Sequence, residues 1–159
     1  QVVLRRKCPG LKPVTEAAAD LEVGDQKSEV GGLSMIQSYK DLNVYKRSYS
    51  LALKVYGIAK ILPKDEQYGL SSQLRRAATS IPLNIAEGYG RKSSEAEFKQ
   101  FLRNSLGSCN EVRVLVDMLK DLSLITKELH KELEDEYHIL ARQLFTLIKK
   151  WQKYPTSGF

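Results

Sequence analysis

The stretch RRAATSIPLNIAEGYGR, residues 75–91, decides the fold, because it joins a helical apolar stripe to an unusual set of polar residues. The apolar residues recur at three- and four-residue steps, as on one face of a helix, and they are Leu70, Leu74, Ala77, Ile81 and Ile85. Off that stripe lie Arg75, Arg76, Asn84 and Glu87. Pro82 is expected to bend the helix, and the glycines at 88 and 90 are expected to end it. The pattern therefore predicts an amphipathic helix from about residue 68 to residue 87.

Three further segments have the same helical period. Residues 39–62 show a heptad seam made of Leu42, Tyr45, Tyr49, Ala52, Tyr56 and Ala59, beside a second stripe made of Leu51, Val55, Ile58 and Leu62. Ser94 and Glu97 form a capping-box pattern that starts a helix reaching Leu122, with small residues clustered at 105–109. Thr126 is expected to cap a last helix that reaches Lys153. Four such helices joined by short links predict an all-α, up-down-up-down antiparallel four-helix bundle with left-handed packing.

The chain has 159 residues, enough for one domain with a real core. Residues 1–34 are rich in Gly and Pro and show no sustained period, so we expect an N-terminal extension, irregular in structure and of unclear status. The bundle domain is expected over residues 35–154, with a frayed tail at 155–159. No apolar run is long enough to span a membrane, and two cysteines make no disulfide framework, so a reducing cytoplasm is the expected location.

The net charge of +6 is unevenly distributed along the chain. It is zero over residues 1–34, +4 over 35–62, +2 over 63–92, −1 over 93–125 and +1 over 126–159. The excess lies in the first half of the helical region. A localised basic excess favours a polyanionic partner such as nucleic acid.

Other chemistry finds little support in the sequence. His130, Glu134 and His138 share one helical face, and Asp135 precedes His138 by three residues, but a di-iron bundle needs this motif on two helices. We therefore expect solvated surface residues and no metal site. The loop expected at 88–91 lacks both a preceding strand and the Gly-Lys-Ser/Thr ending of a nucleotide-triphosphate site, which leaves only a generic phosphate contact or a simple turn. Without a nucleophile paired with a base, or a cofactor fingerprint, we expect a protein that is not an enzyme and needs no cofactor.

Three blocks carry a family resemblance: DLNVYKRSY (41–49), LPKDEQYGLSSQLRRAATSIPLNIAEGYGR (62–91) and EFKQFLRNSLGSCNE (97–111). Residues 38–154 resemble the four-helix bundle proteins encoded within intervening sequences of bacterial 23S rRNA genes. They more distantly resemble the accessory variability determinant of diversity-generating retroelements. The resemblance implies a cytoplasmic bacterial protein that assembles as a homopentamer and presents a basic surface to nucleic acid. It implies no reaction.

The candidate phosphate contacts are Arg75, Arg76, Arg91, Lys92, Lys46 and Arg47. Tyr45, Tyr49 and Tyr89 are expected to stack on bases if exposed, although their spacing favours core packing. Asn84 and Glu87 are expected to form a structural polar network at the end of a helix, with Asn84 fully hydrogen-bonded. We expect RNA or DNA to be bound with low sequence specificity. The alternative is an oligomeric scaffold for a partner protein such as a polymerase, in which the arginines pair within or between subunits, with Glu87 or Asp41 as partners.

Overall fold

The computed structural model describes residues 36–66 and 68–151, and over these residues it contains four long helices and no strand. They are α1 (Asn43–Ile61), α2 (Leu70–Gly90), α3 (Glu95–Asp121) and α4 (Lys127–Lys150). Two single-turn 3-10 helices, η1 (Tyr39–Asp41) and η2 (Lys64–Glu66), precede α1 and α2. The expected extension at 1–34 and the tail at 155–159 lie outside the described residues.

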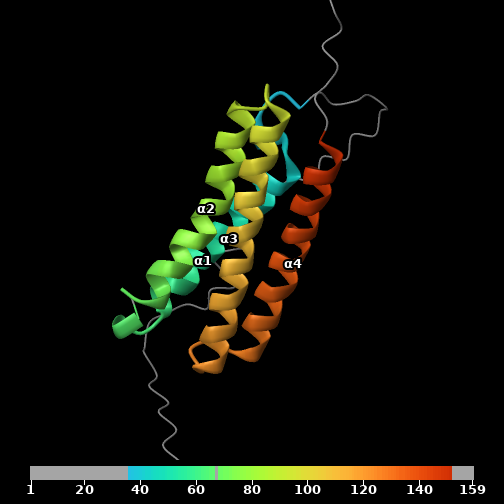
Figure 1. The fold of residues 1–159 in the computed structure, drawn as a ribbon. Coiled ribbons are helices and arrows are strands. Elements are labelled where there is room, and N and C mark those ends of the chain that lie inside the picture. The colour runs from blue at the N-terminus through green and yellow to red at the C-terminus, as the bar shows by residue number, and fades with distance from the viewer. Residues whose placement is uncertain (1–35, 67, 152–159) are drawn as a thin grey trace, which may run out of the picture. The chain divides into compact units, whose positions relative to one another are not determined.

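The helices form an all-α four-helix bundle, as the sequence predicts (Figure 1). Each long helix packs on the next one along the chain, and α1 also packs on α4. The order of helix directions and the left-handed packing stay predictions.

The predicted helix starts are confirmed by their caps. The Ser94 hydroxyl accepts a hydrogen bond from the Glu97 backbone N–H at 3.3 Å, and the Thr126 hydroxyl accepts one from the Leu129 N–H at 3.2 Å. These side chains satisfy N–H groups that the first turn of a helix leaves without a backbone partner. Ser38 caps η1 in the same way, and Asp41 accepts from the Gln37 and Ser38 N–H groups.

The core sits between the buried faces of the four helices. The apolar stripe predicted on α2 is confirmed, since Leu74, Ile81 and Ile85 are fully buried and Pro82 is buried within the helix. At one end of the bundle the aromatic rings pack edge to face. The ring centroids of Tyr89 and Phe98 are 6.3 Å apart, and those of Phe98 and Trp151 are 4.5 Å apart.

The predicted heptad seam of α1 is wrong in part. Tyr49 and Tyr56 are exposed, while the second stripe, with Leu51, Val55 and Ile58, faces the core. A 3-4-3-4 step describes any face of a helix, so the period alone did not identify the buried one.

The predicted glycine stop of α2 is wrong for Gly88 and right for Gly90, because the helix continues through Gly88 and ends at Gly90. Residues 88–90 of the expected loop are therefore helical, and Arg91 is the C-cap. Gly88 is needed for a different reason. A Cβ placed on it would lie 2.5 Å from Phe101 Cβ and 3.0 Å from Phe98 Cδ2, so the glycine lets α2 and α3 approach closely.

Two small residues of α3, Ser105 and Ser108, also contact α2. The buried Ser105 hydroxyl donates to the Ile81 carbonyl of α2 at 3.1 Å, and the Ser108 hydroxyl bonds to that of Ser80 at 3.0 Å. Gly107 takes no part, because a Cβ added to it would meet no atom of another helix within 4 Å. The polar contacts along α2 therefore fix how α2 sits against α3.

Candidate nucleic-acid interface

The outward face of α1 carries a stripe of cations and aromatic rings. At three- and four-residue steps it presents Lys46, Tyr49, Leu53, Tyr56 and Lys60. The exposed fractions are 51% for Tyr49, 52% for Leu53 and 43% for Tyr56, and both lysines are exposed. The Tyr49 ring also stacks on Tyr45, with centroids 6.0 Å apart. Basic residues interleaved with accessible aromatic rings suit a single-stranded nucleic acid, whose phosphates and bases they contact respectively.

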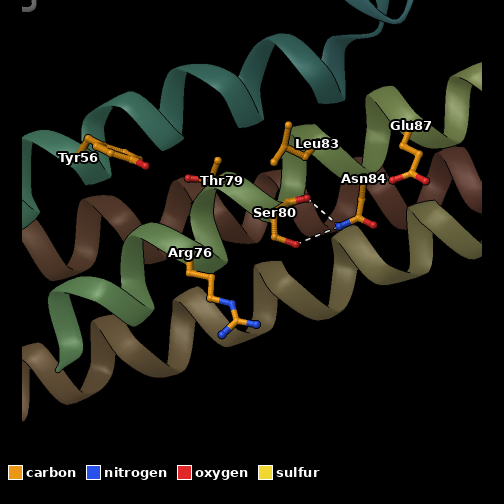
Figure 2. Close-up of a pocket in the computed structure, with 7 residues that line it drawn as sticks. All are labelled: Tyr56, Arg76, Thr79, Ser80, Leu83, Asn84 and Glu87. Atoms are coloured by element: carbon orange, nitrogen blue, oxygen red, sulfur yellow. Dashed lines mark hydrogen bonds between the residues drawn. The ribbon is translucent and has the colours of Figure 1, made fainter. Parts of the chain in front are cut away.

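A pocket of about 410 Å³ opens beside this stripe, on the outer face of α2 (Figure 2). Tyr56 of α1 lines it together with six residues of α2, namely Arg76, Thr79, Ser80, Leu83, Asn84 and Glu87. Figure 2 shows Arg76 and Glu87 toward opposite ends of the row of side chains, with Ser80 and Leu83 between them. The volume falls within the range of small-ligand sites.

Arg76 supplies the positive charge of the pocket. Its side chain is exposed, and within the described residues its guanidinium makes neither an ion pair nor a hydrogen bond. A guanidinium in this state retains all of its donors for a phosphate group. Arg75, its neighbour, is half-buried and already has a partner.

Asn84 is hydrogen-bonded through its amide nitrogen alone among the described residues, whereas the sequence predicts full hydrogen bonding. Its Nδ2 donates to the Ser80 carbonyl at 2.8 Å and to the Ser80 hydroxyl at 2.9 Å, and the latter connects to Ser108 of α3. Glu87 takes a different partner, since its Oε1 accepts from Arg91 Nη2 at 3.2 Å. The two residues line one pocket but bond to different groups.

The charged groups of the remaining predicted phosphate contacts already have partners within the chain. Arg91 contacts Glu87 and Glu97 and lies over the Phe101 ring, 5.3 Å from its centroid. Lys92 Nζ lies 3.8 Å from the centroid of Tyr89, and Arg47 Nη1 lies 2.6 Å from Glu136 Oε2 on α4.

The structure thus divides the six predicted cations into two groups. It places Lys46 and Arg76 on the exposed faces of α1 and α2, and it gives the other four partners, namely Arg47, Arg75, Arg91 and Lys92. Within one chain, among the described residues, Arg76 pairs with neither Glu87 nor Asp41, since Glu87 pairs with Arg91 and Asp41 caps η1. Pairing of the arginines between subunits stays a prediction.

The three tyrosines also differ. Tyr89 is buried, and its hydroxyl donates to the Ile36 carbonyl at 3.0 Å, so core packing is confirmed for it. Tyr45 is half-buried and Tyr49 is exposed.

Sequence reasoning did not identify Tyr56 and Lys60 of the α1 stripe, or Leu83 of the α2 pocket, as candidate site residues. A usable signal was present, because Lys46 and Lys60 stand in the same helical stripe as the tyrosines. Lysines at both ends of a stripe indicate that the stripe faces water.

The histidine-bearing face of α4 forms cross-helix contacts. His130 Nε2 lies 2.6 Å from Asp117 Oδ1, and Glu134 accepts from Arg113 Nε at 3.0 Å, both partners being on α3. Over residues 36–66 and 68–151, no three His, Cys, Asp or Glu side chains are placed to hold a metal ion.

Cys109 is fully buried in the core. Burial raises the pKa of its thiol to about 12, and its Sγ donates to the Tyr137 carbonyl at 3.3 Å. The thiol is therefore protonated at neutral pH.

Comparison with known proteins places these features in context. The model of a family described as 23S rRNA-intervening sequence protein matches residues 40–146. A solved structure from Bacteroides thetaiotaomicron, described as a protein of unknown function from the S23 ribosomal protein family, is 27% identical. It covers 70% of this chain and 99% of its own length, with a TM-score of 0.64. No curated protein matches the chain.

None of the helices in the described ranges has the length and apolar character needed to cross a membrane.

Proposed function

This chain belongs to the 23S rRNA-intervening sequence protein family, and we propose that it is a non-enzymatic, cytoplasmic protein that binds the backbone of RNA or DNA. The binding face consists of the α1 stripe (Lys46, Tyr49, Leu53, Tyr56 and Lys60) and the pocket of α2 with its Arg76. The observation that carries the proposal is the exposed guanidinium of Arg76 beside this stripe, which has no ion pair or hydrogen bond within residues 36–66 and 68–151.

The net charge and the side-chain chemistry of this face both support the proposed binding of nucleic acid. The net charge of residues 35–92 is +6, which equals the excess of the whole chain, and these residues supply α1 and α2. Phosphate contacts by exposed cations give affinity with little sequence preference, and tyrosines add stacking that every base accepts.

A homo-oligomer, for which the family resemblance implies five copies, is part of the proposal. Val114 and Met118 of α3 and its C-cap residue Leu122 form an exposed apolar stripe at four-residue steps. A head-to-tail contact that closes into a ring joins two different patches of the chain, and the α3 stripe is the patch that we assign to it. We expect light scattering to give the mass of an oligomer and Met118→Glu to lower it. A monomeric wild-type protein at micromolar concentration would contradict this part.

The scaffold function is the second candidate, and the α3 stripe is the observation that favours it. If that stripe packs on α1 and α2 of the next copy, the basic face is buried between subunits and leaves other surfaces for a partner protein.

Titration of labelled single- and double-stranded RNA and DNA at several salt concentrations separates the two functions. We expect binding that weakens steeply with salt. Replacing Lys46 and Arg76, the exposed cations of α1 and α2, together by Ala should lower the magnitude of the logarithmic salt slope by about 1.4 for single strands and about 1.8 for duplexes, for two lost phosphate contacts.

The matched control removes two exposed arginines from the other two helices, by Arg103→Ala with Arg142→Ala. It lowers the net charge equally, so a site-specific contact predicts a much smaller change in slope. Equal effects of the two double variants would refute the site. An intact oligomer that binds no nucleic acid at low salt would favour the scaffold.

A further inference from the structure

We infer that the pocket of α2 is a nucleotide subsite that selects bases carrying an exocyclic amino group, with a phosphate of the same strand on Arg76. This inference rests on the proposed function and adds a base preference to it. It follows from the different chemistry of the two ends of the pocket.

One end of the pocket donates hydrogen bonds and the other accepts them. At the donor end the Arg76 guanidinium has no partner among the described residues. At the acceptor end lie the side-chain oxygens of Asn84 and Glu87, and Arg91 occupies only Oε1 of the glutamate. Such a site fits a ligand with an anionic group at one end and N–H donors at the other.

The orientation of the Asn84 amide is fixed by its neighbour. A backbone carbonyl only accepts, so the Asn84 atom 2.8 Å from the Ser80 carbonyl must be the NH₂ group. The same group also reaches the Ser80 hydroxyl at 2.9 Å. Both donors of the amide are therefore used, and Oδ1 is the atom left to accept from a ligand.

The space between the two ends suits a base. Leu83 lies there with 62% of its surface exposed, and Tyr56 lines the pocket from α1. Eight residues separate Arg76 from Asn84, a rise of about 12 Å along the helix. An apolar surface flanked by a phosphate donor and a base-edge acceptor is the arrangement needed to seat one nucleotide.

Cytosine and uracil are the matched probes, because they differ at position 4, where cytosine has an amino group and uracil a carbonyl. We would titrate labelled oligo(dC) and oligo(dU) of about twelve nucleotides, at mildly alkaline pH where cytosine is uncharged. The expected result is about three- to tenfold tighter binding of oligo(dC), as one hydrogen bond to Asn84 Oδ1 predicts. A third oligonucleotide, with pyrimidin-2-one lacking the amino group, should bind as weakly as oligo(dU).

Two variants test the residues. Asn84→Ala should abolish the preference and leave the salt slope unchanged, whereas Arg76→Gln should weaken both oligonucleotides equally and reduce the slope by about 0.7. Ser108→Ala is the control, since Ser108 bonds to Ser80 in the same network but does not line the pocket. It should keep the full preference.

The outcomes are distinguishable. Salt-dependent binding that is equal for all three oligonucleotides would overturn the inference and leave the proposed function standing. No binding of any of them would overturn the inference, and no binding of RNA or duplex DNA at low salt either would overturn the proposed function as well. A preference that persists in a folded Asn84→Ala protein would overturn the role of Asn84. The pyrimidin-2-one probe needs no variant, so the inference stays testable even if Asn84→Ala does not fold.

Discussion

Gly88 offers a sharp test of how α2 packs on α3. An alanine there would place its Cβ 2.5 Å from Phe101 Cβ, and Phe101 Cβ is fixed to the backbone of α3 and cannot rotate away. Ordinary carbon contacts are about 3.5–4.0 Å, so one helix must retreat by about 1 Å. Phe98 Cδ2, at 3.0 Å from the same position, adds to the clash. We therefore expect Gly88→Ala to destabilise the bundle.

The magnitude follows from two opposing effects. Overpacking a filled core costs about 1–3 kcal/mol, whereas Gly→Ala inside a helix stabilises by about 1 kcal/mol. The net change for Gly88→Ala is a loss of about 0–2 kcal/mol. Gly57→Ala is the matched control, because Gly57 lies inside α1 with no atom within 4 Å of the added Cβ, and it should stabilise by about 1 kcal/mol.

Urea denaturation followed by circular dichroism measures both free energies of unfolding. The informative quantity is the difference between the two variants, about 1–3 kcal/mol in favour of Gly57→Ala. Equal stabilisation by both alanines would refute the close approach at Gly88. A variant protein that fails to fold would agree with it only if Gly57→Ala folds normally.

Two further predictions concern the contact between α3 and α4. Because burial raises the pKa of Cys109 from 9.0 to about 12, only the unfolded state loses the thiol proton between these values, so stability should fall with rising pH by up to about 1.4 kcal/mol per pH unit. The free energy of unfolding of Cys109→Ala, measured by denaturation at several pH values, should fall less steeply with rising pH. An equally steep fall would contradict this prediction. Arg113 and Glu134, each about one-third exposed, should show a coupling of about 0.5–1 kcal/mol in a double-mutant cycle, which zero coupling would refute.

The candidate site was only partly predictable from the sequence. The sequence identified Arg76, Asn84 and Lys46 as polar residues of interest, and charge along the chain pointed to the first two long helices. It did not show that Arg91 and Lys92 already contact Glu87, Glu97 and the ring of Tyr89. Such pairing depends on distances between side chains of different turns and helices, which spacing does not give.

The sequence by itself determined the helical fold. Apolar residues at three- and four-residue steps and the caps at Ser94 and Thr126 are local features, because backbone hydrogen bonds and capping act within a few residues. Only the tertiary structure decided which stripe of α1 faces the core, and that Gly88 serves packing against Phe101 and does not end a helix. It also decided that Tyr56 of α1 meets Arg76 and Asn84 of α2 around one pocket. These outcomes depend on where a second helix lies, and no local rule specifies that position.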